Sequence, residues 1–168
     1  MTDFIKLTVP AILVIAGWYV VYRNALKLEF RKDTRKLIEI TIGIVESVTE
    51  DSRDYYSESN RDHIGYLSAR IKADLSLISH YIFMIESCGV KFKGSDALVD
   101  FRKCVSGSYF ETTDFRKQID LPGWHSELSV SSARLKMLLD RCYFEWTNAL
   151  KSKHIVRTYL QKNFKESL

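Results

Sequence analysis

The sequence predicts an all-α protein in which a single N-terminal transmembrane helix continues into a small antiparallel helical bundle. Three observations favour this fold class. An uncharged apolar stretch runs from Leu7 to Tyr22, and a basic stretch follows it directly. Apolar residues then recur every three or four positions over most of the chain, as on one face of a helix. Only two prolines and seven glycines occur in 168 residues, and no segment shows the sustained alternation of a half-buried strand.

The first 22 residues are expected to form a short outer tail and the transmembrane helix. A helix needs about 20 largely apolar residues to cross a hydrocarbon layer of roughly 30 Å. Residues 4–22 come close to that length, and Lys6 can extend its ammonium group to the lipid headgroups. Trp18, Tyr19 and Tyr22 gather at the far end, as interfacial aromatic residues do. The alternatives are a cleaved signal peptide, for which no small-residue cleavage site follows, and a buried core helix.

Residues 23–36 are expected to form a basic juxtamembrane stalk. Their six basic residues are Arg23, Lys27, Arg31, Lys32, Arg35 and Lys36. Two acidic residues oppose them, so the stalk alone accounts for the formal charge of +4. Because basic flanks stay on the cytoplasmic side, we expect a single-pass protein of the inner cell membrane with its N-terminus outside. The same residues can pair with anionic lipid headgroups.

Residues 37–168 are expected to form one cytoplasmic all-helical domain. The first helix should continue from the stalk to Tyr56, with an inner stripe at Leu37, Ile40, Ile44 and Val48 that Ile38, Ile42 and Val45 widen. A second helix is predicted from Asp62 to Ser87, followed by Gly89 as its C-cap. Its predicted inner positions are Ile64, Leu67, Ile71, Leu75, Ile78, Ile82 and Ile85. Since residues 75–85 are apolar nearly all round, we expect this half to be covered on most faces.

The remaining chain should supply one more long helix and several short elements. A short helix, Asp96–Val105, is predicted with Ser95 as its cap, and a helical turn is predicted over 114–119. Pro122-Gly123 fits the centre of a type II turn. The long helix should begin at Ser126. Three long helices would then pack as the antiparallel bundle, with the segment from Val90 to Trp124 crossing one end or flank.

The sequence contains no recognisable catalytic chemistry. The HExxH, CxxC, GxxxxGK[ST] and GxSxG patterns are absent. Four histidines share no obvious site, and His80 is expected to be a core histidine. The three cysteines, Cys88, Cys104 and Cys142, are widely spaced and are expected to be buried thiols. We therefore expect no enzyme activity, no cofactor and no metal. Residues 37–168 carry equal numbers of basic and acidic residues, which argues against a nucleic-acid partner.

The candidate interaction residues lie in two regions. One is the first helix of the domain, with its apolar stripe and the acidic residues near its end. The other is the aromatic segment over residues 106–124. The candidates are Leu37, Ile40, Ile44, Val48, Glu50, Asp54, Tyr109, Phe110 and Trp124.

These observations favour a membrane-anchored helical scaffold. Such a protein would hold another protein, or copies of itself, at the cytoplasmic face of the bilayer. One alternative is a membrane effector, toxin-like or directed against phage, that acts through oligomerisation of its transmembrane helix. A further alternative is a sensor whose helical domain binds a small ligand. Function must be inferred from a site, and the sequence alone shows none.

Overall fold

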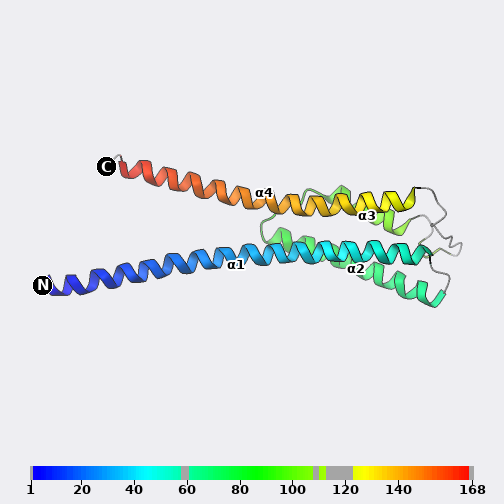
Figure 1. Cartoon of the computed structure of the whole chain (residues 1–168), viewed down its shortest axis with the longest axis horizontal. Coiled ribbons are helices and arrows are strands. Elements are labelled where there is room, and N and C mark those ends of the chain that lie inside the picture. Colours follow the sequence, from blue (N-terminus) through cyan, green and yellow to red (C-terminus); the bar gives the residue numbers. More distant parts are fainter. Residues whose placement is uncertain (1, 58–60, 108–109, 113–122, 167–168) are drawn as a thin grey trace. The chain divides into compact units, whose positions relative to one another are not determined.

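The computed structural model contains four helices over the residues it describes (Figure 1). They are α1 (Thr2–Ser57), α2 (Arg61–Ser87), α3 (Ser95–Ser106) and α4 (Trp124–Glu166). The described backbone covers residues 2–57, 61–107, 110–112 and 123–166, and the described side chains cover 10, 12–57, 63–107, 110–112 and 123–151. Every regular element in these ranges is a helix, so the all-α prediction is confirmed there. The chain divides into two compact units, Met1–Lys36 and Leu37–Leu168, and each is described by itself.

The prediction of a transmembrane helix is not supported by the described residues. On α1 the described side chains begin at Pro10 and Ile12, and the uncharged stretch ends before Arg23. Crossing a membrane takes about 20 largely apolar residues. In the described part of the chain, no helix offers an apolar stretch of sufficient length. Residues 4–9 and 11 of the predicted span lie outside the described side chains.

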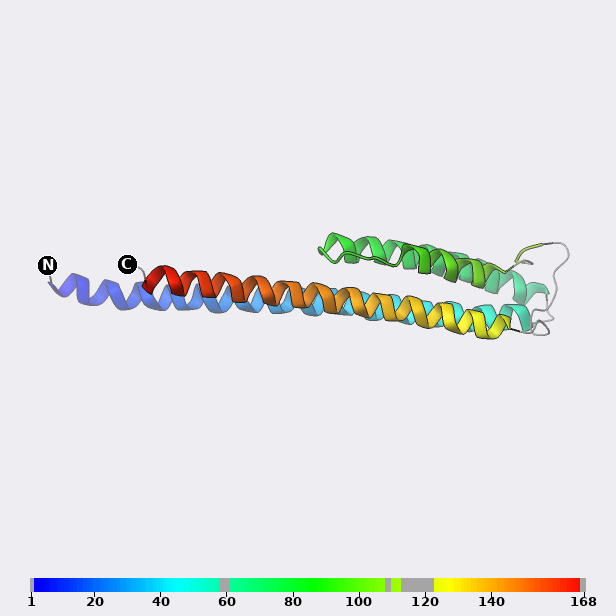
Figure 2. The ribbon, with the colours of Figure 1, turned by 90° about the horizontal axis from the view of Figure 1, so that it is seen from above.

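Within Leu37–Leu168, each helix runs antiparallel to the next. Polar contacts between α1 and α4 join Glu46 to Lys136 and Arg53 to Ser129, so residue numbers rise along one helix as they fall along the other. Asp100 of α3 likewise pairs with Arg134 of α4. Figure 2 shows two layers, with α1 beside α4 in one and α2 beside α3 in the other. The unit is therefore an up-down-up-down four-helix bundle.

This bundle corrects the predicted role of the third helix. The segment was expected to cross an end or flank of three long helices. Instead α3 is the fourth helix of the bundle, and it buries Ala97, Phe101 and Val105 at four-residue spacing. Its N-cap is Gly94 and makes no side-chain cap hydrogen bond, so the predicted Ser95 cap is also wrong. Gly89 does adopt a positive φ of 84° after α2, as a C-cap glycine should.

The buried face of α1 confirms the predicted stripe in part. Its completely buried apolar residues include Ile38, Val45 and Val48, whereas Ile40 is exposed. Buried hydroxyl residues complete this face, and each donates a hydrogen bond to the carbonyl four residues earlier. They are Thr41, Thr49 and Ser52. The Thr49 hydroxyl also lies 3.0 Å from that of Ser132, which is a hydrogen bond between α1 and α4 inside the core.

On α2 the predicted inner stripe is confirmed. Leu67, Ile71, Ile78, Ile82 and Ile85 are buried, and Ile64 and Leu75 pack against the core. The expectation that residues 75–85 are covered on most faces is wrong. In that half of α2 the exposed large apolar residues are Leu77, Phe83 and Met84. The helix is closer to half buried, because only α1 and α3 flank it.

Three expectations at the bundle's other connections have mixed outcomes. The helical turn predicted over 114–119 lies outside the described residues. Pro122 also lies outside them, while Gly123 has the positive φ (99°) required at the second central position of a type II turn. The last helix begins at Trp124, two residues before the predicted start.

Candidate interaction surfaces

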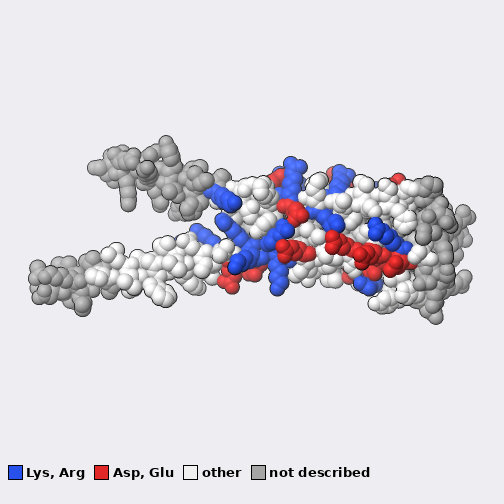
Figure 3. Space-filling view, viewed as in Figure 1, with Lys and Arg blue, Asp and Glu red and all other residues white. Residues whose placement is uncertain are grey.

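The first unit exposes a run of large apolar side chains along α1. From Ile12 to Tyr22 these residues all lie open to the surroundings, and Trp18, Tyr19 and Tyr22 stand at the end of the run. Arg23 follows, with its guanidinium 5.8 Å from the centre of the Tyr19 ring, a cation–π distance. Figure 3 shows this white stretch of α1 giving way to a cluster of basic side chains.

The six predicted membrane-surface residues lie within that basic cluster. Arg23, Lys27, Lys32 and Lys36 are exposed, and Arg31 and Arg35 are half-buried. Arg23, Lys27, Arg31 and Arg35 recur every four residues along one face, and Lys32 and Lys36 widen this row around the axis. The arrangement is therefore a basic collar on α1 that follows the exposed apolar run.

The second half of α1 carries an acidic row. Glu46, Glu50 and Asp54 are exposed at four-residue spacing, and Figure 3 shows acidic side chains aligned along this part of the helix. Lys136 of α4 reaches Glu46, with its Nζ 2.8 Å from Oε1. The two predicted interaction residues in this row, Glu50 and Asp54, lie on the surface where a partner can reach them.

Asp51, beside this row, is the buried acid of the bundle. Its carboxylate pairs with Arg70 of α2, whose Nε lies 3.0 Å from Oδ2, and Arg70 also donates to the Ser47 hydroxyl. Burial raises the pKa of Asp51 above its usual value, although Arg70 acts in the opposite direction. The negative charges of Asp74, Asp54 and Glu50 raise that pKa further.

Aromatic side chains close the end of the bundle where α1 ends and α4 begins. Tyr56 meets the Trp124 ring edge to face at 4.9 Å, and Tyr55 contacts both Tyr56 and Phe110 at the same centroid distance. The Trp124 indole N–H donates to the Cys104 carbonyl at 3.1 Å. Tyr56 is wholly buried, and this burial raises the pKa of its phenol well above the ordinary value.

The predicted aromatic interaction residues are thus mostly internal. Trp124 is buried and Phe110 packs against the core, so these two hold the segment after α3 on the bundle. Tyr109 lies outside the described residues. On the apolar stripe, Val48 is buried, Leu37 and Ile44 pack against the core, and Ile40 is the exposed member.

Glu111 fastens the same segment to the two neighbouring helices. Its backbone N–H donates to the Tyr55 hydroxyl, and its carboxylate accepts from Ser68 and pairs with Lys72, at 2.6 Å from the ammonium. The hydrogen bonds from Lys72 and Ser68 lower the pKa of Glu111. Its φ of +56° is a conformation that few residues other than glycine adopt, so these contacts hold a locally unfavourable backbone in place.

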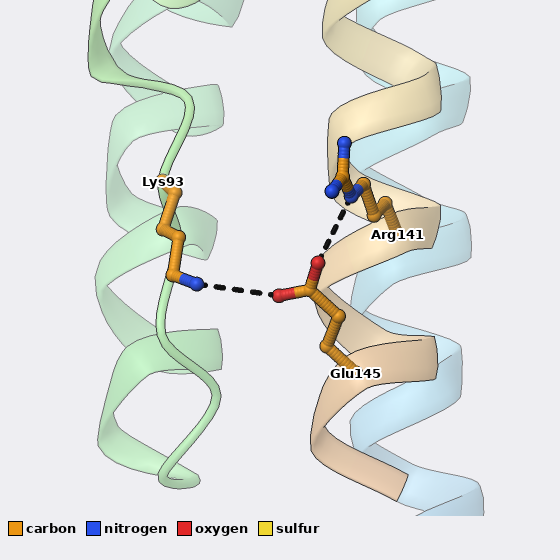
Figure 4. Close-up of polar contacts among 3 residues, drawn as sticks. All are labelled: Lys93, Arg141 and Glu145. Atoms are coloured by element: carbon orange, nitrogen blue, oxygen red, sulfur yellow. Dashed lines mark hydrogen bonds and ion pairs between the residues drawn. The ribbon is translucent and has the colours of Figure 1, made fainter. Parts of the chain in front are cut away.

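A second polar fastening lies between α4 and the connection that precedes α3. Glu145 accepts from Arg141 one helical turn earlier and pairs with Lys93 at 3.4 Å (Figure 4). The hydrogen bond from Arg141, together with the charge of Lys93, lowers the pKa of the Glu145 carboxyl. All three side chains are well exposed, so the contact orients the connection more than it stabilises the bundle.

Two exposed apolar faces were missed by the sequence reading. On α4, Val130, Met137 and Phe144 stand seven residues apart and are all exposed. On α2, Leu77, Phe83 and Met84 surround His80, which is exposed rather than in the core as predicted. The seven-residue spacing on α4 is present in the sequence, but the prediction for this helix considered only its buried stripe.

The described side chains form no grouping suited to a metal ion. Among them, no group of three or more His, Cys, Asp and Glu residues is placed to hold a metal ion. Cys142 is buried as predicted, whereas Cys88 and Cys104 are half-buried, and all three are free thiols. No protein-family model, curated protein or solved structure matches this chain.

Proposed function

We propose that this chain is a non-enzymatic interaction protein that is held at the inner face of a membrane by its first 22 residues. The observation that carries the proposal is the exposed apolar run from Ile12 to Tyr22, followed directly by the basic collar. Exposure of such a run to water is energetically unfavourable, and large exposed apolar patches mark sites that a partner or a membrane covers.

The order of side chains along this segment fits a bilayer better than a protein groove. Apolar residues come first, aromatic residues gather at the end, and six basic residues follow. That order matches the hydrocarbon, interfacial and headgroup layers of a membrane. Residues 4–9 and 11 would lengthen the run to that of a span, with the basic side in the cytoplasm.

The second unit would then be the part that engages other proteins. Its polar clusters are ion pairs and hydrogen bonds that fasten helices together, and its exposed apolar faces lie on α2 and α4. A rigid bundle with exposed apolar faces suits recognition of another helix.

Membrane attachment can be tested with two aspartates placed in the exposed run of the full-length chain. Val14→Asp/Val21→Asp should move the protein from the membrane pellet to the supernatant after carbonate washing. The charge at Val14, near the centre of the predicted span, costs about 2.5–3.5 kcal/mol, and the charge at Val21, near its end, costs less. Val130→Asp is the matched control, since Val130 is 64% exposed on α4 and Val14 is 60% exposed on α1.

Orientation and role can be read in the same membranes. A reporter fused after Leu168 should be active on the cytoplasmic side, and replacing the six basic residues by glutamine should scramble that orientation. Parent protein that stays in the supernatant would refute membrane attachment. Loss of membrane potential on expression would instead favour an effector that acts on the bilayer.

A further inference from the structure

The outer face of α2 lacks the charges that normally cover an exposed helix. Between Gly65 and Met84 this face contains no Lys, Arg, Asp or Glu. Its exposed members are Gly65, Tyr66, Ala69, Ala73, Ser76, Leu77, His80, Phe83 and Met84. The neighbouring charged residues are engaged at its edges, where Arg70 pairs with Asp51 and Lys72 with Glu111.

Gly65 leaves room for another helix backbone to come close to this face. A methyl group added at Gly65 would meet nothing within 4 Å, so packing inside the bundle does not require a glycine. Glycine within a helix is less stable than alanine. Close approach of another backbone is a physical reason for a glycine at such a position.

The first half of the face holds small residues and the second half holds large ones. The face therefore complements itself when a second copy is turned end to end. Its first half holds the small residues Gly65, Ala69 and Ala73, four residues apart. Its second half holds the large residues Leu77, His80 and Phe83. If a second α2 is laid antiparallel on this face about an axis between residues 74 and 75, His80 falls opposite Ala69, Met84 opposite Gly65 and Phe83 opposite Tyr66. Such a contact is the same on both copies, as a two-fold dimer requires.

We propose that the α2 faces of two copies of this chain pack antiparallel to form a homodimer. This names the partner of the interaction role proposed above and rests on that role, but it does not depend on membrane attachment. The lack of charge on the face removes like-charge repulsion between identical copies. The exposed charges at its edges, Arg70 and Lys72, are already paired with Asp51 and Glu111, which weakens their attraction for an acidic partner.

The area of the face is sufficient for a specific but weak dimer. Tyr66, Leu77, Phe83 and Met84 are 60%, 42%, 67% and 37% exposed. At about 200 Å² for a large side chain, they contribute roughly 400 Å² per copy. Val99 of α3 extends the face. Arg102 of α3 bonds Ser79 of α2. Val99 lies one turn before Arg102 and Phe83 lies one turn after Ser79, so in this antiparallel pair of helices the exposed Val99 is level with the exposed Phe83. With the smaller residues the total approaches the lower end of specific interfaces, about 600 Å² per copy.

The test is the mass of the full-length chain in mild detergent, measured over a concentration series that reaches tens of micromolar. The parent should pass from monomer to dimer within that range. Phe83→Glu should raise the dimer dissociation constant at least tenfold. Phe144→Glu is the matched control, since Phe144 on α4 is 66% exposed against 67% for Phe83, and it should change that constant less than twofold.

A charge pair tests the antiparallel register directly. Ala69→Glu and His80→Arg should each weaken the dimer, because each puts a charge against an apolar surface. The double variant Ala69→Glu/His80→Arg should recover pairing to within about threefold of the parent, since each glutamate then meets the arginine of the other copy. In a parallel pair the like charges would face each other, and the double variant would be weaker than either single one.

Several outcomes would overturn the dimer. These are a parent that stays monomeric over the whole series, a Phe144→Glu variant that is the more disruptive of the two, or a double variant that fails to recover. Circular dichroism of each variant separates loss of pairing from loss of folding. The membrane sedimentation of Phe83→Glu should equal that of the parent, so failure of the dimer and failure of membrane attachment are told apart.

Discussion

At the scale of single residues, Asp51 is the position where burial and pairing oppose each other. The net effect raises its pKa, so the folded protein disfavours the ionised carboxylate. Between the usual aspartate pKa and the raised one, the folded state binds more protons than the unfolded state. The free energy of unfolding contributed by Asp51 therefore falls as the pH rises through that range.

We expect Asp51→Asn to melt at or above the temperature of the parent at pH 7. The amide keeps the shape of the carboxyl group and removes the buried charge. Arg70 is 45% exposed, so losing its partner does not leave an uncompensated buried charge. The difference between parent and variant should shrink towards pH 3.5, where Asp51 is protonated. Glu86→Gln, an exposed change on α2, is the control for thermal melts. A large loss of stability in Asp51→Asn alone would mean that the Arg70 pair outweighs the cost of burial.

Two adjacent residues of α2 separate the core from the exposed face. Ile78 is fully buried, whereas Leu77 is 42% exposed. Ile78→Ala should lower the free energy of unfolding by about 2–5 kcal/mol, because it leaves a cavity in the core. Leu77→Ala should cost about 1 kcal/mol or less. Thermal unfolding followed by circular dichroism measures both, and equal losses would mean that the inner face of α2 is assigned wrongly.

At the scale of helices, the sequence was sufficient where apolar residues alone make the buried face. The inner stripe of α2 was predicted residue by residue for this reason. On α1 the prediction was incomplete, because Thr41, Thr49 and Ser52 also lie in the core. A threonine or serine that donates to the carbonyl four residues earlier has satisfied its polar group locally. Such residues look polar in a sequence and behave as apolar volume in a helix bundle.

The sequence pattern of one helix does not show which neighbours α3 packs against or which helix faces stay exposed. The spacing of Ala97, Phe101 and Val105 predicts an amphipathic helix, but not which neighbours it meets. The outer face of α2 was overlooked because residues 75–85 are apolar on both sides, and only the packing of α1 and α3 shows which side is open. The candidate interaction surface therefore changed from the first helix of the domain to the second.

The register of α1 against α4 makes a prediction at the same scale. Glu46→Lys or Lys136→Glu alone should lower stability slightly, since each places like charges together. The charge-swapped double variant should recover the loss, with a coupling energy of about 0.2–1 kcal/mol for an exposed pair. Glu50 with Lys136, one turn away from the observed pair, is the control swap and should show less coupling. No coupling between Glu46 and Lys136 in a double-mutant cycle would contradict the register.

At the scale of the whole molecule, the two units differ in what holds them together. In Leu37–Leu168 the buried side chains come from all four helices and form one core. In Met1–Lys36 the described apolar side chains from Ile12 onward are exposed. The described part of this unit is a single helix, so no second helix within it covers them. A core of this kind gives the second unit its own source of stability, whereas the first unit would gain stability from apolar surroundings.

A fragment from Thr34 to Leu168 should therefore fold without the preceding residues. We expect a helical circular dichroism spectrum and a cooperative thermal transition close to that of the full-length chain. The buried side chains from Ile38 to Cys142 all remain in the fragment, and burial of apolar area is the main stabilising contribution to folding. The fragment should also stay in the supernatant when membranes are sedimented, whereas the full-length chain should pellet. A strand-dominated spectrum would contradict the fold, and a helical spectrum without a cooperative transition would mean that residues before Thr34 are needed to complete the core.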